Sequence, residues 1–147
     1  MKNIILKLLV VFIATFFVGC VQNQNNLDLI KKQKHIILED DNISNWLAFE
    51  KLNYYTKEDG LMLVEAKFTN TTKVDNKILY KIDWFDKNGF TIKTILSRWN
   101  EFEVQPKQSL VIKGISPSID VSNFEIRLQK PAEEYRQNNT DSNEYKN

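Results

Sequence analysis

The sequence contains few of the residues on which cross-linking and catalysis depend. Its 147 residues include one cysteine, one histidine and four glycines. Because a disulfide within the chain needs two cysteines, the folded domain must be held together by packing alone. A Ser-His-Asp or Cys-His arrangement would have to use His35, and the sequence has no glycine-rich phosphate loop, histidine-rich metal site or nucleotide fingerprint. We therefore predict a protein that is not an enzyme and binds no cofactor.

The sequence also lacks an excess of charge of either sign. Its 20 basic and 19 acidic side chains give a formal net charge of +1. Proteins that bind nucleic acid neutralise phosphates with a basic stripe, and no cluster of Lys and Arg interleaved with aromatic residues occurs in this chain. We predict no nucleic-acid partner.

Two groups of acidic residues are candidates for chemistry, and neither has the spacing that the chemistry needs. Asp83 and Asp86 are three positions apart on an extended segment, which places them on opposite faces rather than as a converging acid and base. The run at 39–41, Glu-Asp-Asp, does not match a calcium loop, in which about six to eight oxygens converge. We predict an acidic turn exposed to solvent and no metal site.

The first 19 residues have the three-part form of an export signal: a basic start, an apolar middle over 8–17, and small residues before Cys20. The segment resembles a bacterial lipoprotein signal, in which the cysteine thiol is acylated and a peptidase then cuts before it. The apolar run 4–18 is shorter than the ~20 residues that a transmembrane helix needs. A plain secretory signal would leave a lone thiol in an oxidising compartment. We predict a signal peptide over 1–19 and lipidation of Cys20.

Lipidation would tie the chain to a membrane, and the flanking sequence suggests which one. The residue after the cysteine is Val21 rather than the Asp that resembles an inner-membrane retention signal. We therefore predict an outer-membrane protein facing the periplasm, with surface exposure and the inner membrane left open. Residues 20–34 begin with a polar run and are predicted to be a flexible tether, so His35, where the tether meets the domain, is not expected to have the fixed position that catalysis needs. Residues 131–147 are predicted to be a disordered tail.

Between the tether and the tail, at 35–130, apolar and polar residues alternate with a period of two. Met62, Val64 and Ala66 are one such series, and Phe124, Ile126 and Leu128 are another. The predicted strands are residues 35–38, 46–56, 62–69, 78–85, 92–96, 99–104, 110–115 and 124–129. One helical turn is expected within 41–47, and tight turns are expected to end at Gly60 and Gly89. These features predict an all-β sandwich whose core includes Phe68, Tyr80 and Trp84.

Residues 80–89 carry a family resemblance. This block has the pattern Tyr-x-x-x-Trp-Phe-Asp-x-x-Gly, and it is accompanied by Asn70-Thr71, a Ser-Pro turn at 116–117 and a final Phe-x-Ile-Arg-Leu at 124–128. Together these resemble the YcfL family of small bacterial lipoproteins over residues 36–128. The resemblance implies an immunoglobulin-like antiparallel sandwich of about seven to eight strands, facing the periplasm and without an established activity.

Several family residues also have structural explanations. Tyr80 and Trp84 share a strand face and are expected in the core. The Asp86 carboxylate is expected to accept from the amides of its own turn, Asn70 to cap a strand end, and Arg127 to pair with a surface glutamate, at position 65 or 125.

The aromatic residues suggest how the protein could bind a partner. One buried face of a sheet cannot accommodate all of them, and five form a candidate partner surface: Trp46, Tyr54, Tyr55, Phe85 and Trp99. We predict a non-enzymatic binding or structural module for another envelope component, most readily a protein. The alternative is a carrier for a small apolar or glycan ligand, held in a pocket lined by Trp46, Trp99 and Tyr55.

Asn42 is a candidate modification site. It lies in a run, Asp-Asp-Asn-Ile-Ser at 40–44, that resembles the extended acceptor sequence for periplasmic N-glycosylation, although an Asn-rich chain can produce this pattern by chance.

Overall fold

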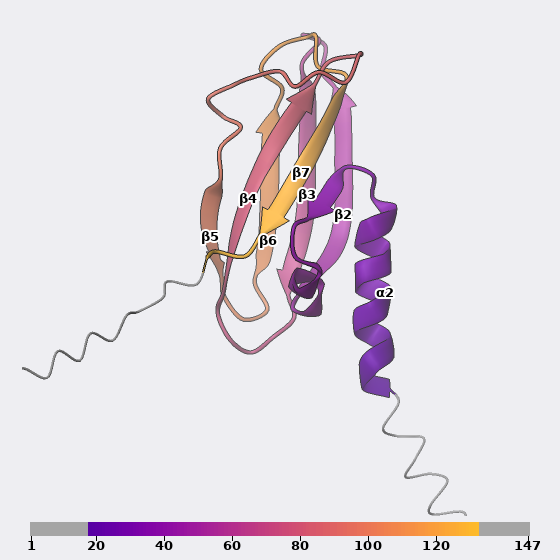
Figure 1. Ribbon diagram of the computed structural model, residues 1–147, viewed down its shortest axis with the longest axis vertical. Coiled ribbons are helices and arrows are strands. Elements are labelled where there is room, and N and C mark those ends of the chain that lie inside the picture. Colours follow the sequence, from indigo (N-terminus) through magenta and orange to yellow (C-terminus); the bar gives the residue numbers. More distant parts are fainter. Residues whose placement is uncertain (1–17, 133–147) are drawn as a thin grey trace, which may run out of the picture.

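The computed structural model describes residues 18–132, in which seven strands form two sheets (Figure 1). The elements are α2 (Val18–Lys32), β1 (Ile36–Leu38), η1 (Asp41–Asn45), β2 (Leu47–Thr56), β3 (Met62–Asn70), β4 (Asn76–Phe85), β5 (Asn100–Val104), β6 (Ser109–Ile115) and β7 (Asn123–Gln129). Most of the predicted signal peptide, 1–17, and most of the predicted tail, 133–147, lie outside the described residues. Between 18 and 132, no helix has both the length and the apolar character needed to cross a membrane.

The first sheet has the strand order β1-β7-β4-β5, and the second has the order β2-β3-β6. All pairings are antiparallel except that of β1 with β7, which is parallel. The prediction of a two-sheet all-β sandwich is confirmed, whereas the expectation of purely antiparallel pairing is wrong at β1. This strand follows a helix rather than a hairpin, so its direction is not imposed by a tight turn.

The core lies between the sheets and follows from the alternation in the sequence. In β3, every second residue from Met62 to Asn70 is buried, and in β7 the buried residues are Phe124, Ile126 and Leu128. Trp84 and Phe68, predicted as core, are among the largest fully buried side chains, and Tyr80 is half-buried and packs against the core cluster. The layers meet mainly through apolar side chains, and this packing holds them without a disulfide.

The turns also follow the sequence. Gly60 and Gly89 both have positive φ, 82° and 84°, as expected for residues that close tight turns. The predicted helical turn is present as η1, where the carboxylate of Asp40 accepts from the backbone N–H of Asn42 at 2.9 Å. The buried Asn70 amide donates to the carbonyls of Val74 and Val104, and so closes the end of β3 as predicted.

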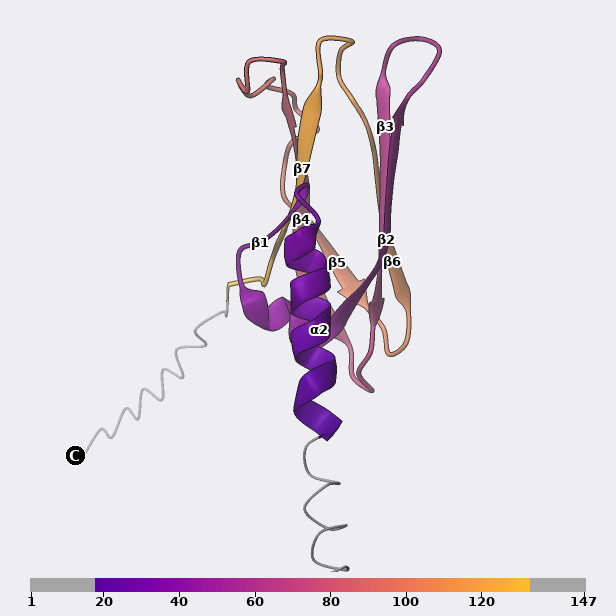
Figure 2. The same cartoon turned by 90° about the vertical axis from the view of Figure 1, so that its right-hand side faces the viewer.

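The predicted flexible tether is wrong for most of its length, because residues 18–32 form α2. Asn26 donates from its side chain to the carbonyl of Leu47 at 3.1 Å and accepts from the N–H of Phe49 at 3.0 Å. Ile30, one turn later on the same helix face, is only 1% exposed. Figure 2 shows α2 lying along the side of the sandwich at which β1 and β2 end their sheets. We call this the closed side.

Candidate binding site

The opposite side of the sandwich, bounded by β5 and β6, carries a cleft of about 510 Å³. Its floor is formed by the inward-facing residues of β4, Tyr80, Ile82 and Trp84, and by Gly114 of β6. Its rim has two parts: Leu96, Arg98 and Asn100 before and at the start of β5, and Leu63, Lys113 and Ile115 on the second sheet. We call it the lateral cleft, and the side of the sandwich that contains it the open side.

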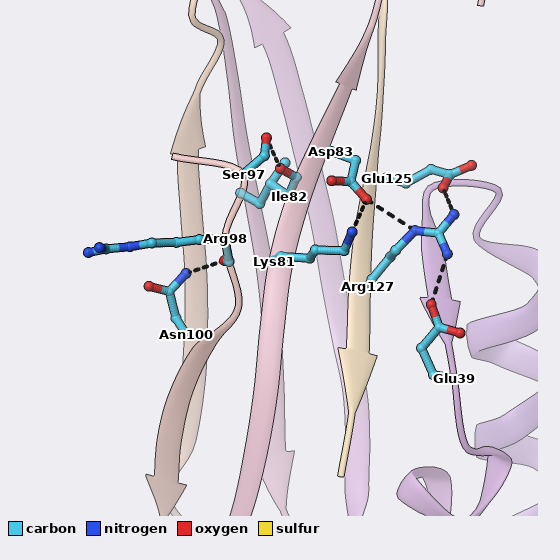
Figure 3. Close-up of polar contacts among 9 residues, drawn as sticks. All are labelled: Glu39, Lys81, Ile82, Asp83, Ser97, Arg98, Asn100, Glu125 and Arg127. Atoms are coloured by element: carbon cyan, nitrogen blue, oxygen red, sulfur yellow. Dashed lines mark hydrogen bonds and ion pairs between the residues drawn. The ribbon is translucent and has the colours of Figure 1, made fainter. Parts of the chain in front are cut away.

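The lateral cleft exists because residues 92–96, predicted as a strand, do not pair with β4 as one. After an isolated bridge between Phe85 and Thr91, Ile92 donates its N–H to the Trp84 carbonyl at 2.8 Å. The next outward acceptor on β4, the Ile82 carbonyl, is bonded at 2.7 Å by the hydroxyl of Ser97 instead of a strand amide (Figure 3). Because no strand of the described chain continues β5 along this edge of β4, the C-terminal half of β4 is accessible from this side of the sandwich.

Gly114 shapes the floor of the cleft. A Cβ atom at this position would lie 2.5 Å from Cδ1 of Ile82 and 3.2 Å from Cζ2 of Trp84. Only a residue without a side chain allows the two β4 residues to approach the β6 backbone this closely. The sequence offered this signal, a glycine inside an apolar strand, but its meaning depends on which residues lie opposite.

The rim of the lateral cleft combines exposed apolar side chains with positively charged ones. Leu96 is 63% exposed and Ile115 is 46% exposed, so both present apolar surface beside the opening. Figure 3 shows the Arg98 side chain pointing away from β4. On the second sheet, Lys113 bonds Glu65 at 2.8 Å, and Lys51 bonds the same carboxylate at 2.9 Å. The hydrogen bond from Lys113, supported by Lys51, lowers the pKa of Glu65 to about 2.

The outer face of the first sheet carries a network of ion pairs centred on Arg127 (Figure 3). Its guanidinium lies 2.6 Å from Glu125, 2.8 Å from Glu39 and 3.2 Å from Asp83. Glu39 and Glu125 raise the pKa of Arg127. The Asp83 contact is an ion pair without hydrogen-bond geometry, since the Arg127 Nε has no hydrogen-bond acceptor among the described residues. Arg127 thus pairs with Glu125, one of the two predicted partners, and holds the segment after β1 on β7 and β4.

The five predicted surface aromatics do not form one surface. Trp46 is 8% exposed and belongs to the core, because the chain turns inward between η1 and β2. Phe85 is half-buried at the end of β4. Tyr55 is exposed on the second sheet, while Trp99 is 38% exposed and lies 5.2 Å from the Lys81 ammonium beside the first sheet. The pocket predicted from Trp46, Trp99 and Tyr55 is therefore not formed.

Tyr54, the remaining member of that set, lies at the closed side with His35. The two rings are 5.0 Å apart, and His35 stacks on Phe124 at 4.4 Å. The His35 Nδ1 atom lies 3.0 Å from the Phe124 carbonyl. The expectation that His35 has no fixed position is wrong, because helix α2 and strand β1 on either side of it are anchored to the sandwich.

The predicted acidic candidates are used locally. Asp86 accepts from the N–H groups of Asn88 and Phe90 in its own turn, as expected. Asp83 faces Lys81 at 2.8 Å. In the run 39–41, Glu39 pairs with Arg127, and the other two residues also pair with cations: Asp40 with Lys130 and Asp41 with Lys31. Within residues 18–132, no cluster of three or more His, Cys, Asp or Glu side chains has the geometry to hold a metal ion.

The two predicted modification sites lie near the start of the described chain. Cys20 belongs to the first turn of α2 as far as its backbone is concerned. Asn42 is exposed in η1, where its amide donates to the Asp40 carboxylate at 2.9 Å. Lipidation and glycosylation both stay predictions, and an intact-mass measurement of the native protein tests both.

The fold defines the general class: a small two-sheet β-sandwich with a helix on one side and a cleft on the other. A family model described as "Protein of unknown function (DUF1425)" matches residues 34–130. The chain belongs to this family, which accounts for the whole sandwich.

Two solved structures share the fold. The crystal structure of Campylobacter jejuni cj0090 is 16% identical, with a TM-score of 0.56 over 67% of this chain and 100% of that one. A DUF1425 family member from Shewanella sp. pv-4 is 17% identical, with a TM-score of 0.52 over 58% of this chain and 79% of that one. No curated protein matches the sequence.

Proposed function

We propose that this chain is a lipid-anchored, non-enzymatic binding module that faces the periplasm and binds another protein of the cell envelope through its open side. The lateral cleft is the observation that carries the binding role. It combines apolar side chains, Ile82, Trp84 and Leu96, with the positively charged groups of Arg98 and Lys113 at its rim. Apolar surface framed by polar groups is typical of sites that bind a partner.

The anchoring part of the proposal rests on the sequence before the fold. The signal-like segment ending at Cys20 and the Val21 that follows favour lipidation and transfer to the outer membrane. The block at 80–89, together with membership of the DUF1425 family, supports the finer assignment to YcfL-like lipoproteins.

Fatty-acid labelling tests the anchor. Cells fed an alkyne-tagged palmitate should incorporate label into the wild-type protein and not into a Cys20→Ala variant, because only the thiol at this position accepts the diacylglyceryl group. Wild-type protein that carries no label would exclude lipid anchoring.

Site-specific photo-crosslinking in living cells tests the binding site. A photoreactive phenylalanine analogue at Leu96 should give a defined protein adduct. The same analogue at Val74 is the matched control, since Val74 is 62% exposed and lies in the turn between β3 and β4, away from the lateral cleft. Equal adducts from both positions, or none from Leu96, would contradict the proposed site.

A carrier for a small apolar ligand is the second candidate, and the size of the lateral cleft favours it. A volume of about 510 Å³ lies within the range of small-molecule sites, and the floor is apolar. Native mass spectrometry of the protein released gently from membranes distinguishes the two candidates. A carrier should retain a small molecule at a fixed stoichiometry, whereas a protein-binding module should not.

A further inference from the structure

We propose that the free edge of β6 receives an extended segment of the partner protein as an additional strand, with an acidic residue opposite Lys113 and apolar residues on either side of that acid. This inference rests on the proposed function and names the partner's chemistry at the same open side. It follows from the edges of the two sheets, the phase of the β6 hydrogen bonds and the local charge.

The described chain has four edge strands, and three of them are protected against pairing. β1 has three residues, and β2 has a bulge between Phe49 and Lys51 and is also bonded by Asn26 of α2. β5 has five residues and directs two acidic side chains, Glu101 and Glu103, outward. β6 has seven residues paired with β3 in an unbroken register, and its single charged residue is Lys113.

The phase of the β6 hydrogen bonds shows which backbone groups face outward. Ser116 donates to the Met62 carbonyl at 2.8 Å, and Asn70 donates to the Gln108 carbonyl at 3.0 Å, so even-numbered β6 residues bond β3. In an antiparallel ladder the intervening residues point their N–H and C=O groups the other way. The backbone groups of Val111, Lys113 and Ile115 therefore lie along the outer edge of β6, ready to pair with another strand.

The side chains around this edge specify an alternating segment. Val111, Lys113 and Ile115 lie on the outer face of the second sheet, and the two apolar residues are each nearly half exposed. On the inner face, Gly114 leaves room beside Ile82 in the lateral cleft. An added strand would direct alternate side chains to these two faces, so apolar residues would enter the cleft while the residue between them met Lys113.

The charge beside the β6 edge favours a strand from another protein over a second copy of this chain. Two lysines, Lys51 and Lys113, share the single carboxylate of Glu65, which leaves one positive charge in excess beside the edge. In the antiparallel self-pairing that places Val111 opposite Ile115, Lys113 would face its own counterpart, and directly opposed like charges destabilise a sheet. A partner strand with a central acidic residue supplies the missing negative charge instead.

Two synthetic peptides test the inference with the ¹⁵N-labelled full-length protein in lipid nanodiscs. The probes are capped Ser-Thr-Val-Glu-Val-Thr-Ser and its Lys-centred counterpart, Ser-Thr-Val-Lys-Val-Thr-Ser. The Glu peptide should slow amide exchange at Val111, Lys113 and Ile115 and leave Ile112, which already bonds β3, unchanged. It should bind about fivefold more tightly than the Lys peptide, and Lys113→Glu should reverse this preference.

A proline on β6 separates strand addition from contact with side chains alone. Val111→Pro removes an outward N–H without breaking a bond to β3, and it should weaken Glu-peptide binding about tenfold. Val111→Thr keeps the N–H and should bind like the wild type. Equal affinity of the two variants, or no change at the three outward amides, would overturn the inference. Concentration-dependent protection without peptide would assign the edge to a second copy and overturn it as well.

The crosslinking experiment at Leu96 distinguishes failure of this inference from failure of the proposed function. If the protein adduct forms equally in Val111→Pro and Val111→Thr cells, the partner binds the open side without strand addition, and only the β6 inference fails. If Leu96 yields no protein adduct in wild-type cells, the proposed function itself fails.

Discussion

The two sides of the sandwich differ in whether the edges of the sheets are covered. On the closed side, α2 satisfies the backbone of β2 through Asn26 and buries Ile30. On the open side, a stretch that could have been a strand is irregular, and a cleft reaches the core residues Ile82 and Trp84. An uncovered edge can pair with other chains, and among the described edge strands β6 is the one that is long, unbroken and uncovered. We expect the largest losses of stability from substitutions on the closed side, whereas substitutions of exposed rim residues on the open side should affect binding.

The largest effect on stability should come from Ile30→Ala. Removing this buried side chain leaves a cavity between α2 and the sandwich and should lower the free energy of unfolding by about 2–5 kcal/mol. Leu96→Ala at the open side, where the residue is largely exposed, is the control and should change it by less than about 0.5 kcal/mol. Urea unfolding followed by tryptophan fluorescence measures both. Similar losses for the two variants would mean that the sides do not differ.

Asn26→Ala should have the next largest effect. It leaves the Leu47 carbonyl and the Phe49 N–H without their side-chain partner, at a cost of about 1–3 kcal/mol. Asn25→Ala alters the neighbouring, exposed residue and should be nearly neutral. The same unfolding measurement applies, and a neutral Asn26→Ala would show that α2 does not stabilise the β2 edge.

Gly114→Ala tests the tight floor of the open side. The new methyl group would meet Ile82 Cδ1, and overpacking of this kind costs about 1–3 kcal/mol, partly offset by the lower entropy of the unfolded chain. We expect a net loss near 1 kcal/mol. Ile82→Val removes the opposing atom, so a double-mutant cycle should show a favourable coupling between the two changes. Additive losses would contradict the close approach of β4 and β6.

Glu65→Gln should have the smallest effect, and its difference in stability from the wild type should disappear in acid. The pKa of Glu65 falls from 4.5 in its ordinary state to about 2 in the folded protein, so its ion pairs stabilise the fold above pH 4.5. This contribution is lost as the pH falls through about 2. The melting temperature of the wild type should therefore decline more steeply between these values than that of Glu65→Gln. If the two melting temperatures declined in parallel, the ion pairs of Glu65 with Lys51 and Lys113 would not contribute to stability.

The sequence predicted the sandwich well because its strands are simple alternations with one buried face. Met62 to Phe68 and Phe124 to Leu128 bury the residues expected of them, and the turns at Gly60 and Gly89 are where glycine indicated. Such local patterns need no knowledge of what lies opposite them in the fold.

Helix α2 and the lateral cleft could not be predicted in the same way. The helix packs through Asn26 and Ile30 within a polar run, and a polar residue that bonds a strand edge leaves no apolar periodicity. Residues 92–96 have the composition of a strand, but Ser97 occupies the acceptor that the strand would have used. Trp46 was expected at the surface, yet only the course of the chain after η1 decides that it is buried. These outcomes depend on tertiary partners.

Helix α2 also bears on how an anchored molecule would meet its neighbours. Cys20 and Asn26 are six residues apart on one continuous helix, a rise of about 9 Å. If Cys20 carries lipid, a short rigid helix rather than a flexible tether connects the sandwich to the membrane. The rotation of the sandwich relative to the bilayer is then restricted. As the protein diffuses in the membrane, its open side would then stay at a nearly constant height above the bilayer. Encounters would become a two-dimensional search with a preset orientation, which raises the effective concentration of any partner held at the same height.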